Sequence, residues 1–337
     1  MTRRLLLLSL IAAVSGCTPR SANAPAGPKT SAAPGQPSAA APAGAKRFYW
    51  VQAVKGHPVH QLTQLAFREG CAKAGYACEV LGTDGPDIPG TIAMAEQALA
   101  RGDAAGMAIW TGNPAYNALI ARAGKQGVPV ILPHFPTPEG SAPGATGVIS
   151  CDPAAYAVEI ANRVGAAMGG KGTVAVTQGS FNTTENMVAE TLRKTMAAKY
   201  PAVKVLPSQE EGFEPMQAIP KAVAILQAHS DVTAAVSTTG GGAQTWAGAQ
   251  RQTSRKLTIV AMDYTRVNLD LVRSGEVYAI VAQPLWQEAM GAAELLSKAA
   301  KHEKVPWWTK LPAPFVTKAD LKPYYDLLDH VEMTIGK

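Results

Sequence analysis

From residue 47 onward, short apolar segments rich in β-branched and aromatic residues alternate with longer segments whose apolar residues follow helical spacing. This alternation predicts parallel β-sheets that are covered by helices. The predicted strands form two successive sets, namely 48–54, 77–81, 106–110, 128–132 and 147–149, then 173–177, 204–207, 233–237, 257–262 and 277–283. The predicted helices include 60–74, 88–100, 115–126, 154–168, 185–199, 215–228, 265–273 and 285–300.

The region with this pattern is too long for a single hydrophobic core. It holds about 290 residues, and single cores stop growing at roughly 250–300 residues. The strand series divides near Ser150, so we expect an α/β protein with two doubly wound, Rossmann-like lobes. Ligands of such sheets bind outside the carboxyl ends of the strands, and two facing sheets would form a cleft.

The first residues have the layout of a lipoprotein signal peptide. Arg3 and Arg4 precede an apolar run at 5–14, and Ser15-Gly16-Cys17 follows, as in the bacterial lipobox. A transmembrane anchor is the alternative, but the apolar run has about ten residues, whereas roughly 20 are needed to span a bilayer. We therefore expect removal of residues 1–16 and lipidation of the Cys17 thiol.

Residues 17–46 are predicted to be a disordered tether behind the lipidated cysteine. Almost all of them after Cys17 are Ala, Pro, Gly, Ser or Thr, a composition that cannot bury enough apolar surface to fold. The expected product is an exported lipoprotein, periplasmic or on the cell surface, that is held to a bacterial membrane through Cys17.

The charge of the chain argues against nucleic acid as a partner. The formal net charge is +6, and removal of Arg3 and Arg4 with the acid-free signal leaves +6 − 2 = +4. The basic residues are scattered rather than clustered, which is typical of a solvated surface. A transcription regulator of related fold would carry a DNA-binding helix-turn-helix where this chain has an export signal.

Three cysteines remain once Cys17 is lipidated, so one disulfide at most is possible. Cys71 and Cys78 lie near the end of a predicted helix and the start of the next strand, where a bridge is feasible in an oxidising compartment. Buried free thiols, including that of Cys151, are the equal alternative.

Five stretches carry a resemblance to a known family, and they read FYWVQAVKGHP at 48–58, MAEQALARG at 94–102, QGVPVI at 126–131, IVAMD at 259–263 and AIVAQP at 279–284. In their order and spacing they resemble the type I periplasmic binding proteins, in particular the ribose-binding branch. The resemblance implies three crossings between lobes, with one lobe of 47–150 and 284–312 and another of 151–283 and 313–337.

The function that this resemblance implies is that of the solute-binding component of an ABC importer. Such a protein captures a sugar or sugar-like molecule between its lobes and hands it to a permease that is driven by an ATPase. We expect a monomer without a cofactor. Two alternatives are a lipoprotein that presents its ligand to a membrane receptor, and a binder of a less polar, non-sugar ligand.

The resemblance also assigns ligand-binding roles to particular residues. Asp263 and Gln283 match the family's acceptor acid and hinge amide, and Phe213 matches an aromatic residue near the sugar. Each has a structural alternative: Asp263 could cap the helix at 265–273, Gln283 could satisfy hinge backbone groups, and Phe213 could belong to the core.

Departures from the ribose-like pattern remove charge and add aromatic or imidazole surface. The expected ligand is therefore less polar than a free pentose, for example a modified sugar, a cyclic polyol or a non-carbohydrate. His134-Phe135 stands in place of an Asp-Arg pair, the chain near Asn186 lacks an Arg, and His60 stands where a stacking aromatic is expected. Trp110 could supply a substitute platform, and the loop around Thr239 could offer backbone N–H groups or be only a flexible turn. The candidate ligand-binding residues are His57, His60, Trp110, His134, Phe135, Asn186, Phe213, Thr239, Asp263 and Gln283.

An enzyme is the main rival class. The chain has no G-x-S-x-G elbow, no phosphate-binding G-x-x-x-x-G-K-[ST] and no H-E-x-x-H. His57, His60 and His134 come nearest to a zinc site, but no Cys or carboxylate partner accompanies them in the sequence. We therefore expect neither catalysis nor a metal.

Overall fold

The computed structural model describes residues 46–335 of the 337-residue chain. The predicted signal peptide, the lipidation site at Cys17 and the tether as far as residue 45 lie outside the described residues. Within the described part, none of the helices is both long and apolar enough to cross a membrane.

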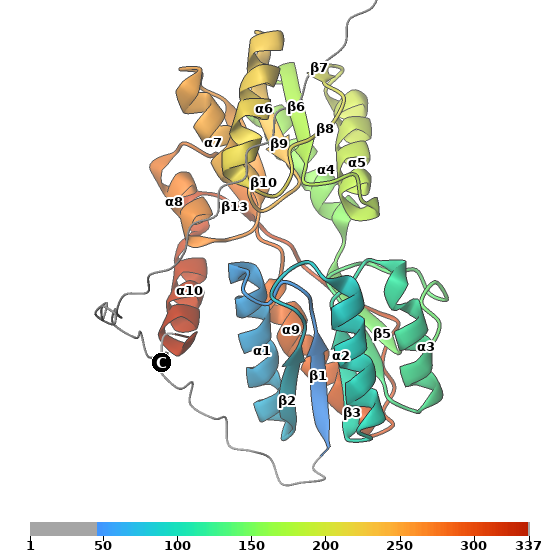
Figure 1. Ribbon diagram of the computed structural model, residues 1–337. Coiled ribbons are helices and arrows are strands. Elements are labelled where there is room, and N and C mark those ends of the chain that lie inside the picture. The colour runs from blue at the N-terminus through green and yellow to red at the C-terminus, as the bar shows by residue number, and fades with distance from the viewer. Residues whose placement is uncertain (1–45, 336–337) are drawn as a thin grey trace, which may run out of the picture. The chain divides into compact units, whose positions relative to one another are not determined.

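The first lobe is built on a six-stranded parallel sheet in the order β12-β5-β4-β3-β1-β2 (Figure 1). Its strands are β1 (Arg47–Val51), β2 (Ala77–Leu81), β3 (Ala104–Ile109), β4 (Val130–Pro133), β5 (Gly147–Cys151) and β12 (Trp308–Leu311). Its helices are α1 (Pro58–Ala74), α2 (Ile88–Ala100), α3 (Asn117–Lys125) and α9 (Leu285–Ala300), with a 3₁₀ turn at Pro114–Tyr116. Helices α1 and α9 cover one face of the sheet, and α2 and α3 cover the other.

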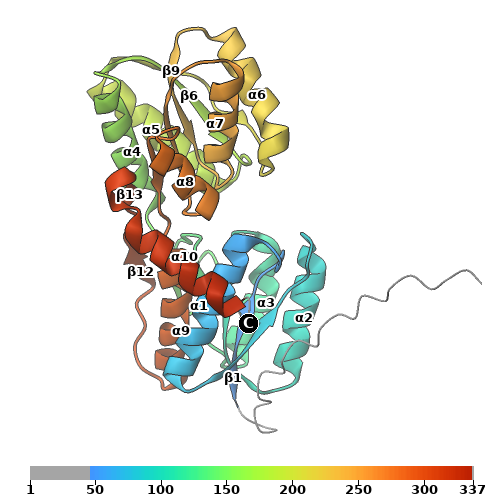
Figure 2. The ribbon, with the colours of Figure 1, turned by 90° about the vertical axis from the view of Figure 1, so that its left-hand side faces the viewer.

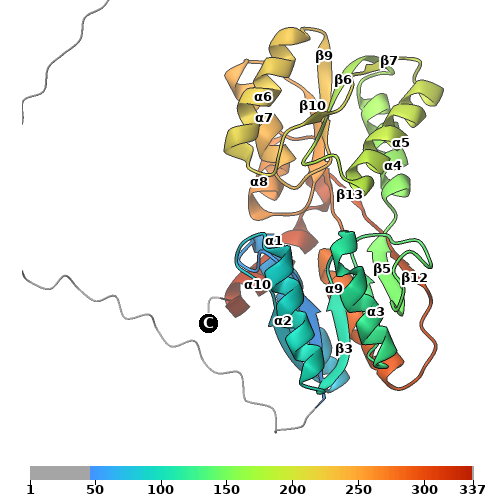
Figure 3. The same cartoon turned by 45° about the vertical axis from the view of Figure 1, so that its right-hand side comes forward.

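The second lobe has a sheet in the order β13-β11-β10-β9-β6-β7, with β8 paired to β6. Its strands are β6 (Lys171–Gln178), β7 (Ala202–Val205), β8 (Gln209–Glu210), β9 (Val232–Ser237), β10 (Thr258–Met262), β11 (Ala279–Val281) and β13 (Phe315–Val316), of which β13 alone is antiparallel to its neighbour. Helices α4 (Pro153–Ala167) and α5 (Thr183–Lys199) cover one face, and α6 (Pro215–Ala228), α7 (Gly242–Gln252) and α8 (Arg266–Ser274) cover the other (Figure 3).

The last helix, α10 (Lys322–Ile335), follows a 3₁₀ turn at Lys318–Asp320 and lies against α8 (Figure 2). Leu328 and Val331 of α10 join the apolar cluster that contains α7 and α8. The rings of Tyr264 and Tyr324 add an aromatic contact at 5.1 Å.

This architecture confirms the predicted fold class of two α/β lobes with parallel sheets. Most predicted elements are present with shifts of a few residues at their ends, and the predicted strand at 277–283 shrinks to Ala279–Val281. The lobe boundaries in the sequence stay predictions. The sequence analysis did not name β8, β12, β13, α7 or α10.

A disulfide joins Cys71 near the end of α1 to Cys78 in β2, with the two Cα atoms 6.1 Å apart. Of the two alternatives that the sequence left open, the bridge is therefore the one formed. Cys151, at the end of β5, is a buried free thiol.

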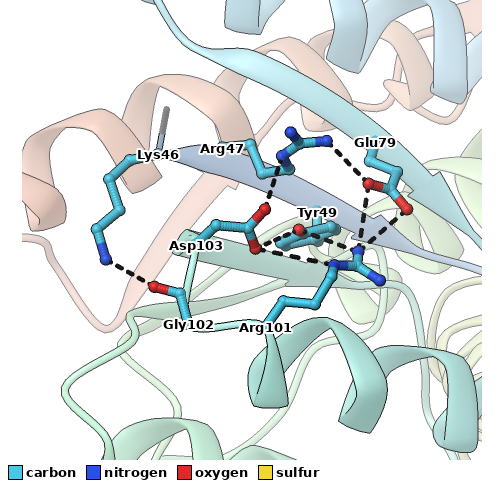
Figure 4. Close-up of polar contacts among 7 residues, drawn as sticks. All are labelled: Lys46, Arg47, Tyr49, Glu79, Arg101, Gly102 and Asp103. Atoms are coloured by element: carbon cyan, nitrogen blue, oxygen red, sulfur yellow. Dashed lines mark hydrogen bonds and ion pairs between the residues drawn. The ribbon is translucent and has the colours of Figure 1, made fainter. Parts of the chain in front are cut away.

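A charged network surrounds the amino end of β1 (Figure 4). Arg47 pairs with Glu79 at 3.1 Å and with Asp103 at 3.0 Å, and Arg101 pairs with Glu79 at 3.2 Å. The hydroxyl of Tyr49 donates to Asp103 at 2.6 Å, and burial together with this carboxylate raises the pKa of Tyr49 to about 12. The network lies at the edge of the sheet opposite the carboxyl ends of its strands.

Candidate functional site

Three residues just beyond the carboxyl ends of strands have a left-handed backbone. Val54 follows β1 with a φ of 58°, His134 follows β4 with a φ of 76°, and Asp263 follows β10 with a φ of 66°. This conformation is costly for non-glycine residues, most of all for a β-branched valine, and it tends to occur at functional sites. The strained positions therefore point to the strand ends as the candidate site.

Aromatic rings gather at this edge of the first lobe. Trp110, directly after β3, stacks on His134 with centroids 4.3 Å apart and an interplanar angle of 9°. Phe135 contacts His134 edge-on at 4.8 Å, and His60 lies 6.0 Å from Trp110. Four predicted site residues thus come together, and they form a surface suited to the apolar face of a ring.

The contacts of His60 define which of its ring nitrogens carries the proton. Its Nδ1 lies 2.9 Å from the carbonyl oxygens of both Ala53 and Val54, and carbonyls can only accept, so Nδ1 is the donor. Burial, aided by the charge of His57, lowers the pKa of His60 to about 4. Neutral His60 therefore keeps Nε2 as a hydrogen-bond acceptor. His57 itself is exposed and caps α1 by accepting from the Val59 N–H at 3.3 Å.

His134 forms an ion pair with a residue that the sequence analysis missed. Its Nδ1 lies 3.0 Å from Oε2 of Glu288, which is fully buried in the first turn of α9. Burial alone would lower the pKa of His134, but the charge and hydrogen bond of Glu288 outweigh it and the pKa is raised. One sequence signal could have revealed Glu288: it is a lone acid on the apolar face of the predicted helix, between Leu285 and Ala289.

Asp263 is not the N-cap of α8. Thr265 has that role, because its hydroxyl accepts from the Asn268 N–H at 3.2 Å. The Asp263 carboxyl lies against Gly240, where a side-chain carbon would come within 2.7 Å of Oδ2. Its Oδ1 is buried and has no hydrogen-bond partner among the described residues. The pKa of Asp263 is raised to about 6, mainly by burial. Within this net shift, the charge of His134 lowers the pKa, and the charges of Glu288 and Glu185 raise it.

Asn268 holds the backbone on which Asp263 sits. Its buried Nδ2 lies 2.9 Å from the carbonyl oxygen of Gly240, 3.1 Å from that of Met262 and 3.0 Å from that of Asp263. These contacts tie the loop after β9 to the turn after β10. Nothing in the sequence distinguishes this asparagine from an ordinary residue in the first turn of a helix.

Two buried carboxylates, those of Glu211 and Glu185, hold the loops at the carboxyl ends of the second lobe's strands. The sequence analysis identified neither residue. Glu211 accepts from the hydroxyls of Thr177, at 3.1 Å, and Ser237, and burial raises its pKa to about 7. Glu185 accepts from the Gly179 N–H and the Thr238 hydroxyl, each at 2.6 Å. The two carboxylates fix the loops that follow β6, β8 and β9.

Phe213 projects from one of these loops and is 61% exposed, so the alternative that it belongs to the core is wrong. Its ring lies against Gly179, where any side-chain carbon would clash at 2.3 Å. The glycine therefore leaves room for the aromatic ring beside the carboxyl ends of the second lobe's strands.

The other predicted residues lie apart or are engaged locally. Asn186 is exposed and accepts from Gln178 at 3.1 Å, and it lines a groove of about 450 Å³ beside α5 that none of the other predicted residues reaches. Thr239 is buried, and its N–H donates weakly to Ser237 at 3.4 Å. Gln283 is half-buried, and it follows β11 on the side of Cys151, a thiol whose pKa burial raises strongly.

Comparison with known proteins places this arrangement in a family. The model of the Periplasmic binding protein domain matches residues 48–304, about three quarters of the chain. The chain belongs to the periplasmic binding protein family. The predicted resemblance to its type I members is confirmed. Among residues 46–335, no three His, Cys, Asp or Glu side chains form a group that could bind a metal ion.

Solved structures of periplasmic binding proteins share the fold. An arabinose-binding protein from Geobacillus stearothermophilus has 21% identity and a TM-score of 0.75, covering 83% of this chain and 99% of its own. A sugar-binding protein of a sugar ABC transporter from Bacillus halodurans has 20% identity and a TM-score of 0.77, covering 83% of this chain and 100% of its own. A periplasmic solute-binding protein from Actinobacillus succinogenes with bound D-allose has 17% identity and a TM-score of 0.76, with coverages of 83% and 100%. Among curated proteins, none matches this sequence.

Proposed function

We propose that this protein is the solute-binding component of an ABC importer and captures a sugar or sugar-like molecule between its two lobes. The first lobe would supply the rings of Trp110, His134 and Phe135, and the second would supply Asp263 and Phe213. The arabinose- and allose-binding proteins named above have the same fold, and both bind sugars.

The single observation that carries this proposal is the convergence of aromatic and charged groups at the strand ends. The Trp110–His134 stack offers an apolar surface, and His134, His60 and Asp263 offer a donor, an acceptor and a charged acceptor. Sugar rings need both kinds of contact, because their C–H faces are apolar and their hydroxyls need hydrogen-bond partners.

A thermal-shift screen of sugars and polyols against the full chain tests the proposal. A ligand that binds only the folded state raises the melting temperature by mass action. Calorimetric titration of each hit should then show that Asp263→Asn weakens binding about ten- to a hundredfold, as expected for loss of a charge-assisted hydrogen bond. Glu159→Gln removes one exposed acid on α4 and serves as the matched control. A panel without a single stabilising sugar or polyol would contradict the proposal.

The remaining elements of the proposal concern location and partners. Membership of the family implies an exported protein. We further propose lipidation at Cys17, a monomeric state, and delivery to a permease with its ATPase. Delivery to a membrane receptor would make the protein a sensor instead, and loss of ligand uptake on gene deletion distinguishes the two roles.

A further inference from the structure

The candidate site contains more buried negative than positive charge. Asp263 and Glu288 contribute two carboxyl groups, and His134 contributes one imidazole, which is already paired with Glu288 at 3.0 Å. The charge of His134 lowers the pKa of Asp263 while those of Glu288 and Glu185 raise it, so Asp263 and the His134–Glu288 pair form one electrostatic cluster, to which Glu185 adds further negative charge. With His134 protonated and both acids ionised, the cluster has a net charge of −1.

Two basic side chains at or beyond the carboxyl ends of first-lobe strands have acidic neighbours. Lys55, in the loop after β1, faces Asp84 at 3.8 Å, and Lys310, at the end of β12, pairs with Asp152 at 3.0 Å. In the described part of the chain, His134 is the one cation that lowers the pKa of Asp263. The protein itself therefore leaves the negative charge of this cluster uncompensated.

Two carboxylate oxygens in the cluster are buried without a partner. Oε1 of the fully buried Glu288 and Oδ1 of Asp263 accept no hydrogen bond from any residue in 46–335. Buried acceptors are nearly always paired in native proteins, so unpaired ones at a binding site indicate a donor supplied from outside. Nε2 of neutral His60 adds a third acceptor, so the cluster favours a ligand rich in donors.

The aromatic surroundings favour a cation over a neutral group. Trp110 and Phe135 lie beside His134, and Phe213 is exposed on the second lobe. Aromatic faces attract cations, and this attraction strengthens when water is excluded. Around a neutral sugar the hydroxyls could donate to the carboxylate oxygens but would leave the net negative charge of the enclosed cluster in place, whereas a bound cation would also neutralise it.

We infer that the ligand is a polyhydroxylated ring with a basic nitrogen, such as an amino sugar or aminocyclitol, whose ammonium group binds Asp263. An ammonium group brings three donors and one positive charge, so it can donate to the unpaired Oδ1 of Asp263 and neutralise the cluster. The inference rests on the proposed function, because it assumes that the ligand ring lies between the lobes.

Calorimetric titration of the full chain at pH 7 with matched probes tests the inference. The probes are D-glucosamine, D-glucose and N-acetyl-D-glucosamine, and the corresponding three compounds of the galactose series. We expect at least one amino sugar to bind tenfold or more tightly than both its hydroxyl and its N-acetyl counterpart. Asp263→Asn should abolish this preference, whereas Glu159→Gln, which removes an exposed acid on α4, should preserve it.

Each other outcome separates the inference from the proposed function. If neutral sugars bind as tightly as their amino counterparts, the amine inference is wrong and the sugar-binding function stands. If cyclohexylamine binds as tightly as the amino sugars, the cation site stands and the sugar-binding function is wrong. If none of these probes binds, the amine inference is wrong, and the thermal-shift screen of sugars and polyols decides whether the proposed function stands. A preference for amines that survives in Asp263→Asn would overturn the assignment of the ammonium group to Asp263.

Discussion

The left-handed backbone at His134 and Asp263 limits which residues can replace them. Asn and Asp tolerate this conformation best among non-glycine residues, and histidine is also enriched in it. Asparagine is therefore the substitution that changes the chemistry of either position with least disturbance of the fold. An alanine at Asp263 would combine a loss of charge with backbone strain, and the two effects could not be separated.

Asp263→Asn should stabilise the ligand-free protein at neutral pH. The folded state raises the pKa of Asp263 from 3.8 to about 6, so its contribution to stability is fully present below pH 3.8 and is lost as the pH rises through 6. The loss amounts to at most about 3 kcal/mol, at about 1.4 kcal/mol per pKa unit. Denaturation curves between pH 4 and 8 measure it. A wild-type protein without this decline relative to the variant would contradict the pKa shift.

His134→Asn should be strongly destabilising because it leaves the buried carboxylate of Glu288 alone. Breaking a buried pair costs about 3–5 kcal/mol, and the double variant His134→Asn, Glu288→Gln should lose less than His134→Asn. Because the pKa of His134 is raised from 6.5, its stabilising effect is full below pH 6.5 and is lost as the pH rises through the folded value. Urea denaturation of the wild type, His134→Asn, Glu288→Gln and the double variant gives the coupling free energy between the two side chains. Additive effects of the two substitutions would refute the pairing.

Which site residues could be predicted from the sequence depended on their position relative to the strands. Trp110, His134 and Asp263 each directly follow a strand, and strand ends can be located from apolar periodicity. Glu288 and Asn268 escaped notice because their roles depend on contacts with residues far along the chain or on a specific loop geometry. Such contacts follow from tertiary packing, and of the two residues only Glu288 left a local signal, as a lone acid on the apolar face of its helix.

At the scale of elements, most helices were predictable from the sequence and the two-residue strands were not, while α7 and the 14-residue α10 were missed despite their length. The helices Ile88–Ala100, Pro215–Ala228 and Leu285–Ala300 begin and end where the periodicity predicts. Strand β13 has only two residues, which is too short for alternation to be recognised. Helix α7 begins at the last glycine of a Gly240-Gly241-Gly242 run that reads as a turn, and so its start was hidden.

The Cys71–Cys78 bridge should stabilise the packing of α1 against β2. In the chain-entropy account, a loop of this size contributes about 2–3 kcal/mol, and the free energy of unfolding of Cys71→Ala, Cys78→Ala should fall by that amount. Dithiothreitol should lower the melting temperature of the wild type but not that of the double variant. An equal effect of the reductant on both proteins would contradict the bridge.

At the scale of the whole molecule, the two lobes should approach each other when ligand binds. Groups from both lobes can enclose a ligand only if the lobes close around it, as hinged binding proteins do. Small-angle scattering of the full chain, with and without the tightest probe from the screen, should show a smaller radius of gyration when the probe is bound. The Asp263→Asn variant at the same probe concentration should contract less. An unchanged radius at saturation would exclude closure.

Attachment to the membrane should depend on Cys17 alone. Cys17→Ser removes the thiol that would carry the lipid. Cell fractionation should therefore find this variant unprocessed or soluble. Continued membrane retention after signal removal would refute lipid anchoring through this residue.

The charged network at the amino end of β1 has a practical consequence for biosensor design. Lys46, whose Nζ donates to the Gly102 carbonyl at 3.0 Å, and Arg47 lie at the edge of the sheet opposite Trp110 and His134. A chip linker or affinity tag fused upstream of Lys46 would therefore join the first lobe at the edge remote from the rings of Trp110 and His134. A fluorophore meant to report occupancy belongs at the other edge, for example near Phe213, where an environment-sensitive dye would experience the loss of solvent.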